Sequence, residues 1–308
     1  MHDLTQVASP SVCLKSDLTA TVVVCTRNRP ALLRKCLEGI AQLERTPDEV
    51  IVVDNTSGDK ETNAIAREFA AVYRFEPIQG LSRARNRGMS ESNSEIVVYL
   101  DDDAVPDEHW LGNILEPFKD PKVAAVAGRI LTPEPSAEND TIQVVRYLSN
   151  KDPKWFEVVT FGGFCLGSNM AIRRSVCARK KVFDERLGKG APFQIAEEHY
   201  ALAYLVSHGY TAVYLPDAIV FHPPLRFGEV KQEARNRIAY WMVLFFEFPR
   251  LRLELLRALF RRMRRKPLTQ PRDASGSGKI ITSGWRVLLG ASLSAVPLYF
   301  RTRNPKNR

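Results

Sequence analysis

Residues 95–103, with the sequence EIVVYLDDD, decide the fold class and carry the first sign of chemistry. Residues 96–100 are β-branched, aromatic or apolar, and they predict a buried strand. Such strands are typical of parallel sheets covered on both faces, where ligands bind at the carboxyl ends of the strands. Asp101 and Asp103 stand two residues apart, so in an extended chain they point the same way. Paired carboxylates favour a divalent cation such as Mg²⁺ or Mn²⁺, and the alternative is a solvated acidic turn.

The same pattern extends to both sides of this stretch. Residues 21–25 (TVVVC) and 49–54 (EVIVVD) predict two more buried strands, residues 72–75 predict a short one, and apolar residues at helical spacing separate them. Strand and helix therefore alternate, which predicts right-handed crossovers and a parallel sheet with helices on both faces. Further along we expect a helix over residues 106–118 and two short strands over residues 212–215 and 218–221.

Composition is ordinary for a globular protein, but the charge is uneven. The 308 residues are 44% hydrophobic and 26% charged, with a net charge of +9. From residue 226 onward there are 19 Lys or Arg and 5 Asp or Glu, which gives +14, so the first 225 residues carry 9 − 14 = −5. Five cysteines without CxxC spacing predict reduced thiols and no zinc site. The same cysteines predict a cytoplasmic protein. The N-terminus has no basic-then-apolar signal sequence, and no apolar run has the length of an ordinary membrane span.

Four motifs in this order resemble family 2 glycosyltransferases. They are CTRNRP (residues 25–30), VIVVDN (50–55), GLSRARNRG (80–88) and YLDDDAVPDEHW (99–110), and the similarity runs from about Thr21 to about Pro223. The resemblance implies a GT-A fold, that is, an α/β Rossmann-like domain with a central mostly parallel sheet and helices on both faces. We expect a flexible leader (1–18), this domain (19–228) and a C-terminal basic helical region (229–308). The resemblance further implies inverting transfer of a sugar from a nucleoside-diphosphate sugar to an acceptor hydroxyl, with Mg²⁺ or Mn²⁺ as cofactor.

The resemblance also assigns residues to the donor. It places Asp54 at the nucleotide base and Arg83 near the diphosphate, whereas Arg85 is expected on a solvated basic face. The residues expected to bind the nucleotide sugar are Thr26, Arg29, Asp54, Arg83, Asp101 and Asp102. Asp103 is expected to touch the metal directly, with Asp101 and Asp102 supporting the ribose, water and outer shell. The alternatives are a helix-capping role for Asp54 and simple solvation for the arginines.

Three residues in the second half of the domain complete the expected site. Glu197 and Glu198 match the position where the family commonly has Glu-Asp at the start of a helix, with the second acid as general base. We therefore expect Glu198 to be the base, with Glu197 as the other candidate; capping alone would also place acids there. His222 follows an apolar strand and is either a metal ligand or a satisfied structural residue.

The C-terminal region predicts an amphipathic basic helix. Leu251, Leu255, Leu259 and Met263 recur every four residues beside a cluster of arginines. Such helices lie in the membrane interface, so we expect peripheral attachment at the inner face of the cell membrane. The alternatives are that this apolar face covers the catalytic domain, or that the arginines are a solvated face or bind nucleic acid. Nucleic acid is disfavoured because the acidic site lies in the negative part of the chain.

The expected activity is glycosyl transfer in cell-envelope polysaccharide, glycolipid or related glycan synthesis. The acceptor would be a glycan, a lipid-linked molecule or a small molecule with a hydroxyl group. A nucleotidyltransferase on a similar fold is the alternative enzyme, although CTRNRP lacks the glycine that its phosphate loop usually needs. The other alternative is a non-catalytic nucleotide-sugar-binding protein.

Overall fold

The structure is a computed structural model that describes residues 18–55, 60–133, 144–161, 164, 167–177, 181–224, 230–264 and 294–302. The expected leader lies outside these residues except for Leu18.

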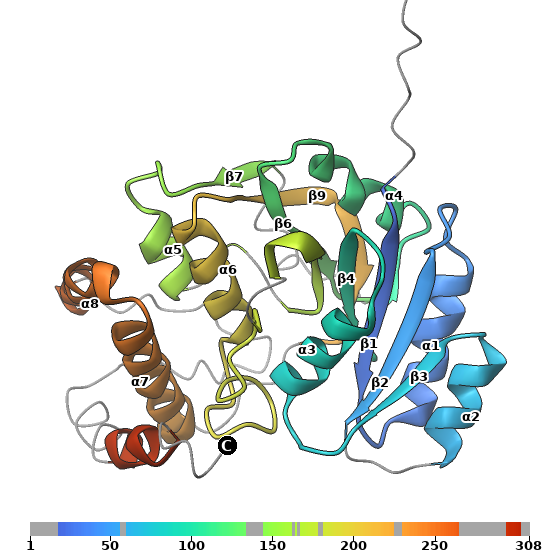
Figure 1. Ribbon diagram of the computed structural model, residues 1–308, viewed down its shortest axis with the longest axis horizontal. Coiled ribbons are helices and arrows are strands. Elements are labelled where there is room, and N and C mark those ends of the chain that lie inside the picture. The colour runs from blue at the N-terminus through green and yellow to red at the C-terminus, as the bar shows by residue number, and fades with distance from the viewer. Residues whose placement is uncertain are drawn as a thin grey trace, which may run out of the picture.

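One sheet of nine strands organises the described chain (Figure 1). The strand order is β3-β2-β1-β4-β8-β6-β9-β5, and β7 pairs with β9. The strands are β1 (Ala20–Thr26), β2 (Glu49–Asn55), β3 (Val72–Glu76), β4 (Ile96–Asp101), β5 (Val105–Pro106), β6 (Val123–Leu131), β7 (Arg146–Leu148), β8 (Asn169–Arg173) and β9 (Thr211–Phe221).

The N-terminal half is a parallel α/β unit, as the alternation of strand and helix predicts. Strands β1 to β4 are parallel to one another, and they are joined by α1 (Pro30–Ala41), α2 (Lys60–Glu68) and α3 (Leu81–Glu91). In the register of these strands, Thr26 pairs with Asp54, and Cys25 pairs with Asp101. The carboxyl ends of β1, β2 and β4 therefore meet at one edge of the sheet.

Helices cover both faces of the sheet, because side chains alternate along each buried strand. Val22, Val24 and Val52 face a core that includes α1 and α4 (Trp110–Leu115). Val23 and Ile51 face the other core, which includes α3, α5 (Trp155–Phe161) and α6 (Glu197–Ser207). The expected fold class is confirmed.

Two local expectations are wrong. The segment expected to be helical from residue 106 instead starts with β5 on β9, because the amide of Asp107 donates to the carbonyl of Ile219. The helix begins only at Trp110, and a 3₁₀ turn (Glu116–Lys119) follows it. The two expected short strands are one strand, β9, whose pairing with β6 shifts register after Gly128.

The C-terminal helices complete one of the two cores. They are α7 (Val230–Glu247), a 3₁₀ turn (Pro249–Leu251), α8 (Arg252–Arg264) and a helix over residues 294–302. Tyr240 and Val243 of α7 belong to the same apolar cluster as Tyr99 of β4. An ion pair of 2.8 Å between Arg186 and Glu247 also ties α7 to the domain.

The apolar face of α8 that was expected to meet lipid faces the protein instead. Leu255 is buried in this core, and Leu251 and Leu259 pack against it. For Leu251, Leu255 and Leu259, the alternative prediction that this face covers the catalytic domain is therefore correct. The structure does not describe the side chain of Met263. Among the described helices, none is long and apolar enough to cross a bilayer.

Candidate active site

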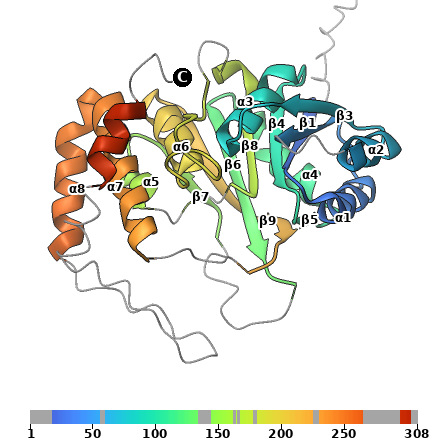
Figure 2. The same cartoon turned by 90° about the horizontal axis from the view of Figure 1, so that it is seen from below.

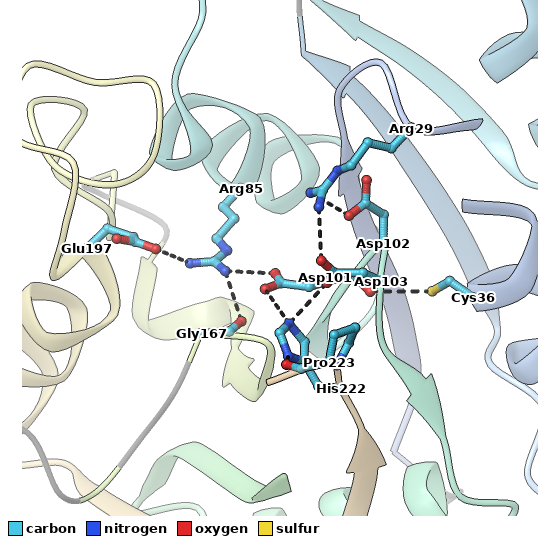
Figure 3. Close-up of polar contacts among 10 residues, drawn as sticks. All are labelled: Arg29, Cys36, Arg85, Asp101, Asp102, Asp103, Gly167, Glu197, His222 and Pro223. Atoms are coloured by element: carbon cyan, nitrogen blue, oxygen red, sulfur yellow. Dashed lines mark hydrogen bonds and ion pairs between the residues drawn. The ribbon is translucent and has the colours of Figure 1, made fainter. Parts of the chain in front are cut away.

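The acidic triplet follows β4 at the edge where the parallel strands end (Figure 3). Asp102 points away from its two neighbours and is fully buried. Its carboxylate accepts a hydrogen bond from the Thr26 hydroxyl at 2.6 Å, and it pairs with Arg29 at 2.6 Å. Burial raises the pKa of Asp102 to about 6. Asp102 therefore anchors the triplet to the strand-one loop.

Asp101 and Asp103 face His222, which follows β9. The Nε2 atom of His222 lies 3.0 Å from Oδ1 of Asp103 and 4.0 Å from Oδ2 of Asp101. One ligand atom from each of the three residues lies within 4.8 Å of the other two. Asp101 and Asp103 therefore point the same way in the structure, as their two-residue spacing predicts.

The donor set of these three residues fits a divalent metal ion. The Nδ1–H of His222 donates to the carbonyl of Pro223 at 2.6 Å, so Nε2 is the nitrogen turned toward the carboxylates. Metal-binding histidines commonly use one nitrogen for a backbone carbonyl and the other for the metal. The hydrogen bond to Asp103 raises the pKa of His222, because it favours the protonated ring. Two carboxylates and an imidazole suit Mn²⁺, and the carboxylates also suit Mg²⁺.

Arg29 lies at the mouth of this group, one residue before α1. Its guanidinium bridges Asp102 at 2.6 Å and Asp103 at 2.9 Å. The side chain is 38% exposed, which leaves it room to move toward a ligand. The guanidinium of Arg29 therefore already contacts Oδ2 of Asp103.

Arg85 is a buried cation on the opposite side of the triplet, and Figure 3 shows it between Glu197 and Asp101. Its guanidinium donates to Glu197 at 2.7 Å, to Asp101 at 3.2 Å and to the carbonyl of Gly167 at 2.9 Å. A Cβ at residue 167 would lie 2.7 Å from both η nitrogens, so glycine permits this approach. Burial opposes the charge of Arg85, but the two carboxylates outweigh it and raise the pKa above its usual range.

The same guanidinium lies near two aromatic rings. It is 6.0 Å from the ring centre of Tyr99 and 5.7 Å from that of Phe183. These contacts hold Arg85 in place and add a cation–π attraction. Arg85 therefore links helix α6, which begins at Glu197, to the end of β4.

The two acids of α6 have different surroundings. Glu197 is buried with its Oε1 on Arg85, and burial together with the charge of Glu198 raises its pKa to about 7. Glu198 is partly exposed, but its Oε2 is buried without a hydrogen-bond partner among the described residues. It lines a small apolar pocket with Met170 and Leu205, and burial raises its pKa. One acid is committed to a salt bridge, whereas the other retains an unpaired oxygen.

Asp54 and Asn55 end β2 at the same edge. Asp54 is fully buried and accepts a hydrogen bond from the hydroxyl of Tyr73 at 2.8 Å. Asn55 accepts from the amide of Gly80 at 2.9 Å and donates to the carbonyl of Ile78 at 2.8 Å. Asn55 thereby fixes the turn that starts α3, the helix that carries Arg85.

Comparison with known families identifies the fold just described. The profile of the family described as "Glycosyl transferase family 2" matches residues 21–179, which is 159 of the 308 residues. This chain belongs to that family. The match covers β1 to β8, including the acidic triplet and Arg85, and it ends before Glu197, Glu198 and His222.

Individual proteins that are similar to this family 2 glycosyltransferase are also glycosyltransferases. Glycosyltransferase AglE of Haloferax volcanii is 26% identical over 235 residues, 72% of this chain and 74% of AglE. The O-antigen chain rhamnosyltransferase RfbN of Salmonella typhimurium is 26% identical over 215 residues, 66% of this chain and 65% of RfbN. The mannosyltransferase PcManGT of Pyrobaculum calidifontis, solved with GDP-Man and Mn²⁺, has a TM-score of 0.59 at 21% identity, over 94% of this chain and 83% of that one. The structural likeness shows the shared GT-A fold.

The sequence-based predictions for two arginines of α3 have different outcomes. Arg83 forms an ion pair of 2.7 Å with Glu185, and its expected role at the diphosphate stays a prediction. Arg85, expected on a solvated face, is buried inside the site, so that expectation is wrong. A signal was present in the sequence, because Leu81, Arg85 and Met89 recur every four residues on one helix face.

Proposed function

We propose that this glycosyltransferase moves a sugar from a nucleoside-diphosphate sugar to an acceptor hydroxyl, with inversion and with a bound Mn²⁺ or Mg²⁺. The observation that carries the proposal is the convergence of Asp101, Asp103 and His222 at the strand-end edge, with the acids of α6 across Arg85. Membership of family 2 supports glycosyl transfer over the nucleotidyltransferase alternative. The solved relative with GDP-Man and Mn²⁺ supports a nucleotide-sugar donor and a metal.

The donor would lie along the carboxyl ends of β1, β2 and β4. Asp101, Asp103 and His222 would hold the metal ion, which would offset the charge of the departing nucleoside diphosphate. Arg29 is the guanidinium nearest to the metal-binding carboxylates, and it would turn from Asp103 to the diphosphate. The remaining donor contacts are assigned to Thr26, Asp54, Arg83, Asp101 and Asp102.

Glu198 is the proposed general base. A base must be free to accept a proton from the acceptor hydroxyl, and Glu198 has an unpaired oxygen and a raised pKa. Glu197 is committed to Arg85, so its proposed role is to hold that arginine between α6 and Asp101. Positioning and charge stabilisation would supply most of the rate acceleration.

Two substitutions separate these roles. Glu198→Gln changes a partly exposed acid whose Oε2 is buried without a hydrogen-bond partner among the described residues, so it should lower kcat by about 10²–10⁴-fold without loss of stability. Glu197→Gln replaces the carboxylate that pairs with Arg85 by a neutral group of the same shape, so it should lower kcat less than Glu198→Gln does. A larger loss of kcat in Glu197→Gln than in Glu198→Gln, at a temperature where both are folded, would reverse the assignment.

A panel of nucleotide sugars tests the activity itself. Release of nucleoside diphosphate with Mn²⁺ or Mg²⁺, and its loss in Asp103→Ala, is the expected result. Pyrophosphate as product would indicate a nucleotidyltransferase, and no product with any donor or acceptor would indicate a binding protein. The anomeric configuration of the product, measured by NMR, tests inversion.

The acceptor is proposed to be a lipid-linked or cell-envelope glycan. The name of RfbN, an O-antigen chain rhamnosyltransferase, supports this class. The +14 charge beyond residue 225 supports work at the inner, cytoplasmic face of an anionic membrane. A screen of lipid-linked acceptors against free sugars tests this preference.

A further inference from the structure

The outer face of α8 exposes an apolar stripe. Leu253, Leu256 and Phe260 are 59%, 52% and 53% exposed, and their spacing of three and four residues puts them on one helix face. The opposite face, with Leu255 and Ala258, is buried against the domain. Figures 1 and 2 both place α8 at the end of the molecule away from α1 and α2. We call Leu253, Leu256 and Phe260 the α8 stripe.

Basic side chains border the α8 stripe. Arg257 follows Leu256 and is exposed, and Arg261 follows Phe260 and is exposed while it pairs with Glu157 at 3.1 Å. Arg250 is exposed in the 3₁₀ turn before α8. Helix α8 itself holds five arginines and one glutamate. A second copy of such a surface would repel the first, whereas anionic headgroups would attract it.

We propose that the α8 stripe inserts at the surface of an anionic lipid bilayer, with α8 parallel to the membrane. Apolar residues flanked by cations are the chemistry that interfacial helices use, and the two features together give stable attachment. The face that meets lipid is therefore not the one suggested by the four-residue repeat of Leu251, Leu255 and Leu259, which packs inward.

The location of α8 relates the proposed membrane attachment to the active site. Helix α8 contacts α5, and α5 contacts α6, the helix that carries Glu197 and Glu198. Docking would thus bring the acceptor side of the site near the membrane. This purpose rests on the proposed lipid-linked acceptor, but the attachment itself is measured without any acceptor.

Vesicle flotation of the full chain tests the proposal. The protein should float with vesicles that contain phosphatidylglycerol and should remain in the bottom fraction with pure phosphatidylcholine vesicles. Salt at 0.5 M should reduce flotation, because it screens the attraction between the arginines and the anionic headgroups. A variant with Leu253→Ser, Leu256→Ser and Phe260→Ser should bind at least about tenfold more weakly. Tyr147→Ser, which alters an exposed aromatic residue on β7, is the matched control and should float like the parent.

A second measurement separates this proposal from the proposed function. Metal-dependent hydrolysis of the nucleotide sugar in solution should be unchanged in the stripe variant, because its residues lie outside the site. The proposal is overturned if the parent does not float with anionic vesicles, or if the stripe variant floats equally well. It is also overturned if the variant changes only the oligomeric state, since the stripe would then join two copies.

Discussion

The sharpest test of the site is Arg85→Met, which keeps most of the side-chain volume and removes the charge. The substitution would leave Glu197 buried without its 2.7 Å partner and Asp101 without its 3.2 Å contact. Because this guanidinium joins α6 to β4, the substitution should lower the free energy of unfolding. It should also displace the carboxylates of Glu197 and Asp101.

The size of the effect follows from burial. Arg85 and Glu197 are nearly inaccessible to water, with side chains 2% and 8% exposed. Removing one partner of a buried pair costs about 3–5 kcal/mol. At about 2 °C per kcal/mol for a chain of this size, the midpoint of thermal unfolding should fall by about 6–10 °C.

The effect should depend on pH. Glu197 has a folded-state pKa of about 7, raised above its unfolded value, so it stabilises the fold when protonated and loses this contribution as pH rises toward 7. Arg85 lowers that pKa, so removing the arginine should move it higher and extend the loss to higher pH. The difference in unfolding midpoint between parent and variant should therefore be larger at pH 9 than at pH 6.

The assay combines scanning calorimetry at both pH values with kcat/KM for nucleoside-diphosphate release, measured below the unfolding transition. The matched control is Arg83→Met, on the same helix, whose pair with Glu185 is about one fifth exposed. It should change stability by no more than about 1 kcal/mol. If Arg83→Met loses more stability than Arg85→Met, or if the Arg85→Met effect is independent of pH, the reasoning about the buried pair is refuted.

The remaining predictions concern the proposed metal-binding residues and the packing of Arg85. Asp103→Ala should weaken Mn²⁺ binding in calorimetry at least about tenfold, and chelation by EDTA should abolish a turnover that added Mn²⁺ restores. Arg29→Ala should instead tighten Mn²⁺ binding about two- to fivefold in donor-free protein, because the guanidinium no longer holds Asp103, while binding of nucleoside diphosphate weakens. Gly167→Ala should cost about 1–3 kcal/mol on denaturant unfolding, since its Cβ would meet Arg85. Mn²⁺ binding at pH 6 should release protons, seen as a dependence of the calorimetric heat on the buffer, because His222 must lose its proton to bind the metal and its hydrogen bond to Asp103 raises its pKa.

The local sequence was enough to predict the strand-end edge of the site. Apolar runs ending in polar residues predicted β1, β2 and β4, and parallel pairing brings Thr26 opposite Asp54 and Cys25 opposite Asp101. The position of His222 after an apolar strand was also readable. These features depend on strand periodicity and on the direction of crossovers, which short stretches of sequence determine.

The location of Arg85 depends on contacts that short stretches do not determine. Its partner Glu197 is 112 residues away on α6, and α3 and α6 contribute to the same core on one face of the sheet. Three arginines within residues 83–87 suggested a solvated helix face. The four-residue spacing of Arg85 from Leu81 and Met89 indicated instead that Arg85 shares a face with apolar residues. The inward face of α8 was missed for a related reason, because an apolar repeat does not reveal whether lipid or protein covers it.

The charges of the site favour the proposed divalent cation. Asp101, Asp102, Asp103 and the two acids of α6 bring five carboxylates together, and Arg29 and Arg85 supply two fixed positive charges. When all five carboxylates are ionised, the balance is negative even with His222 protonated. The pKa of Asp102 is about 6 and that of Glu197 about 7 chiefly because burial disfavours the ionised carboxylates, and the neighbouring acids add to this effect. A metal ion at Asp101, Asp103 and His222 would supply the missing charge beside the diphosphate, while the buried Arg85 keeps the acids of α6 in place.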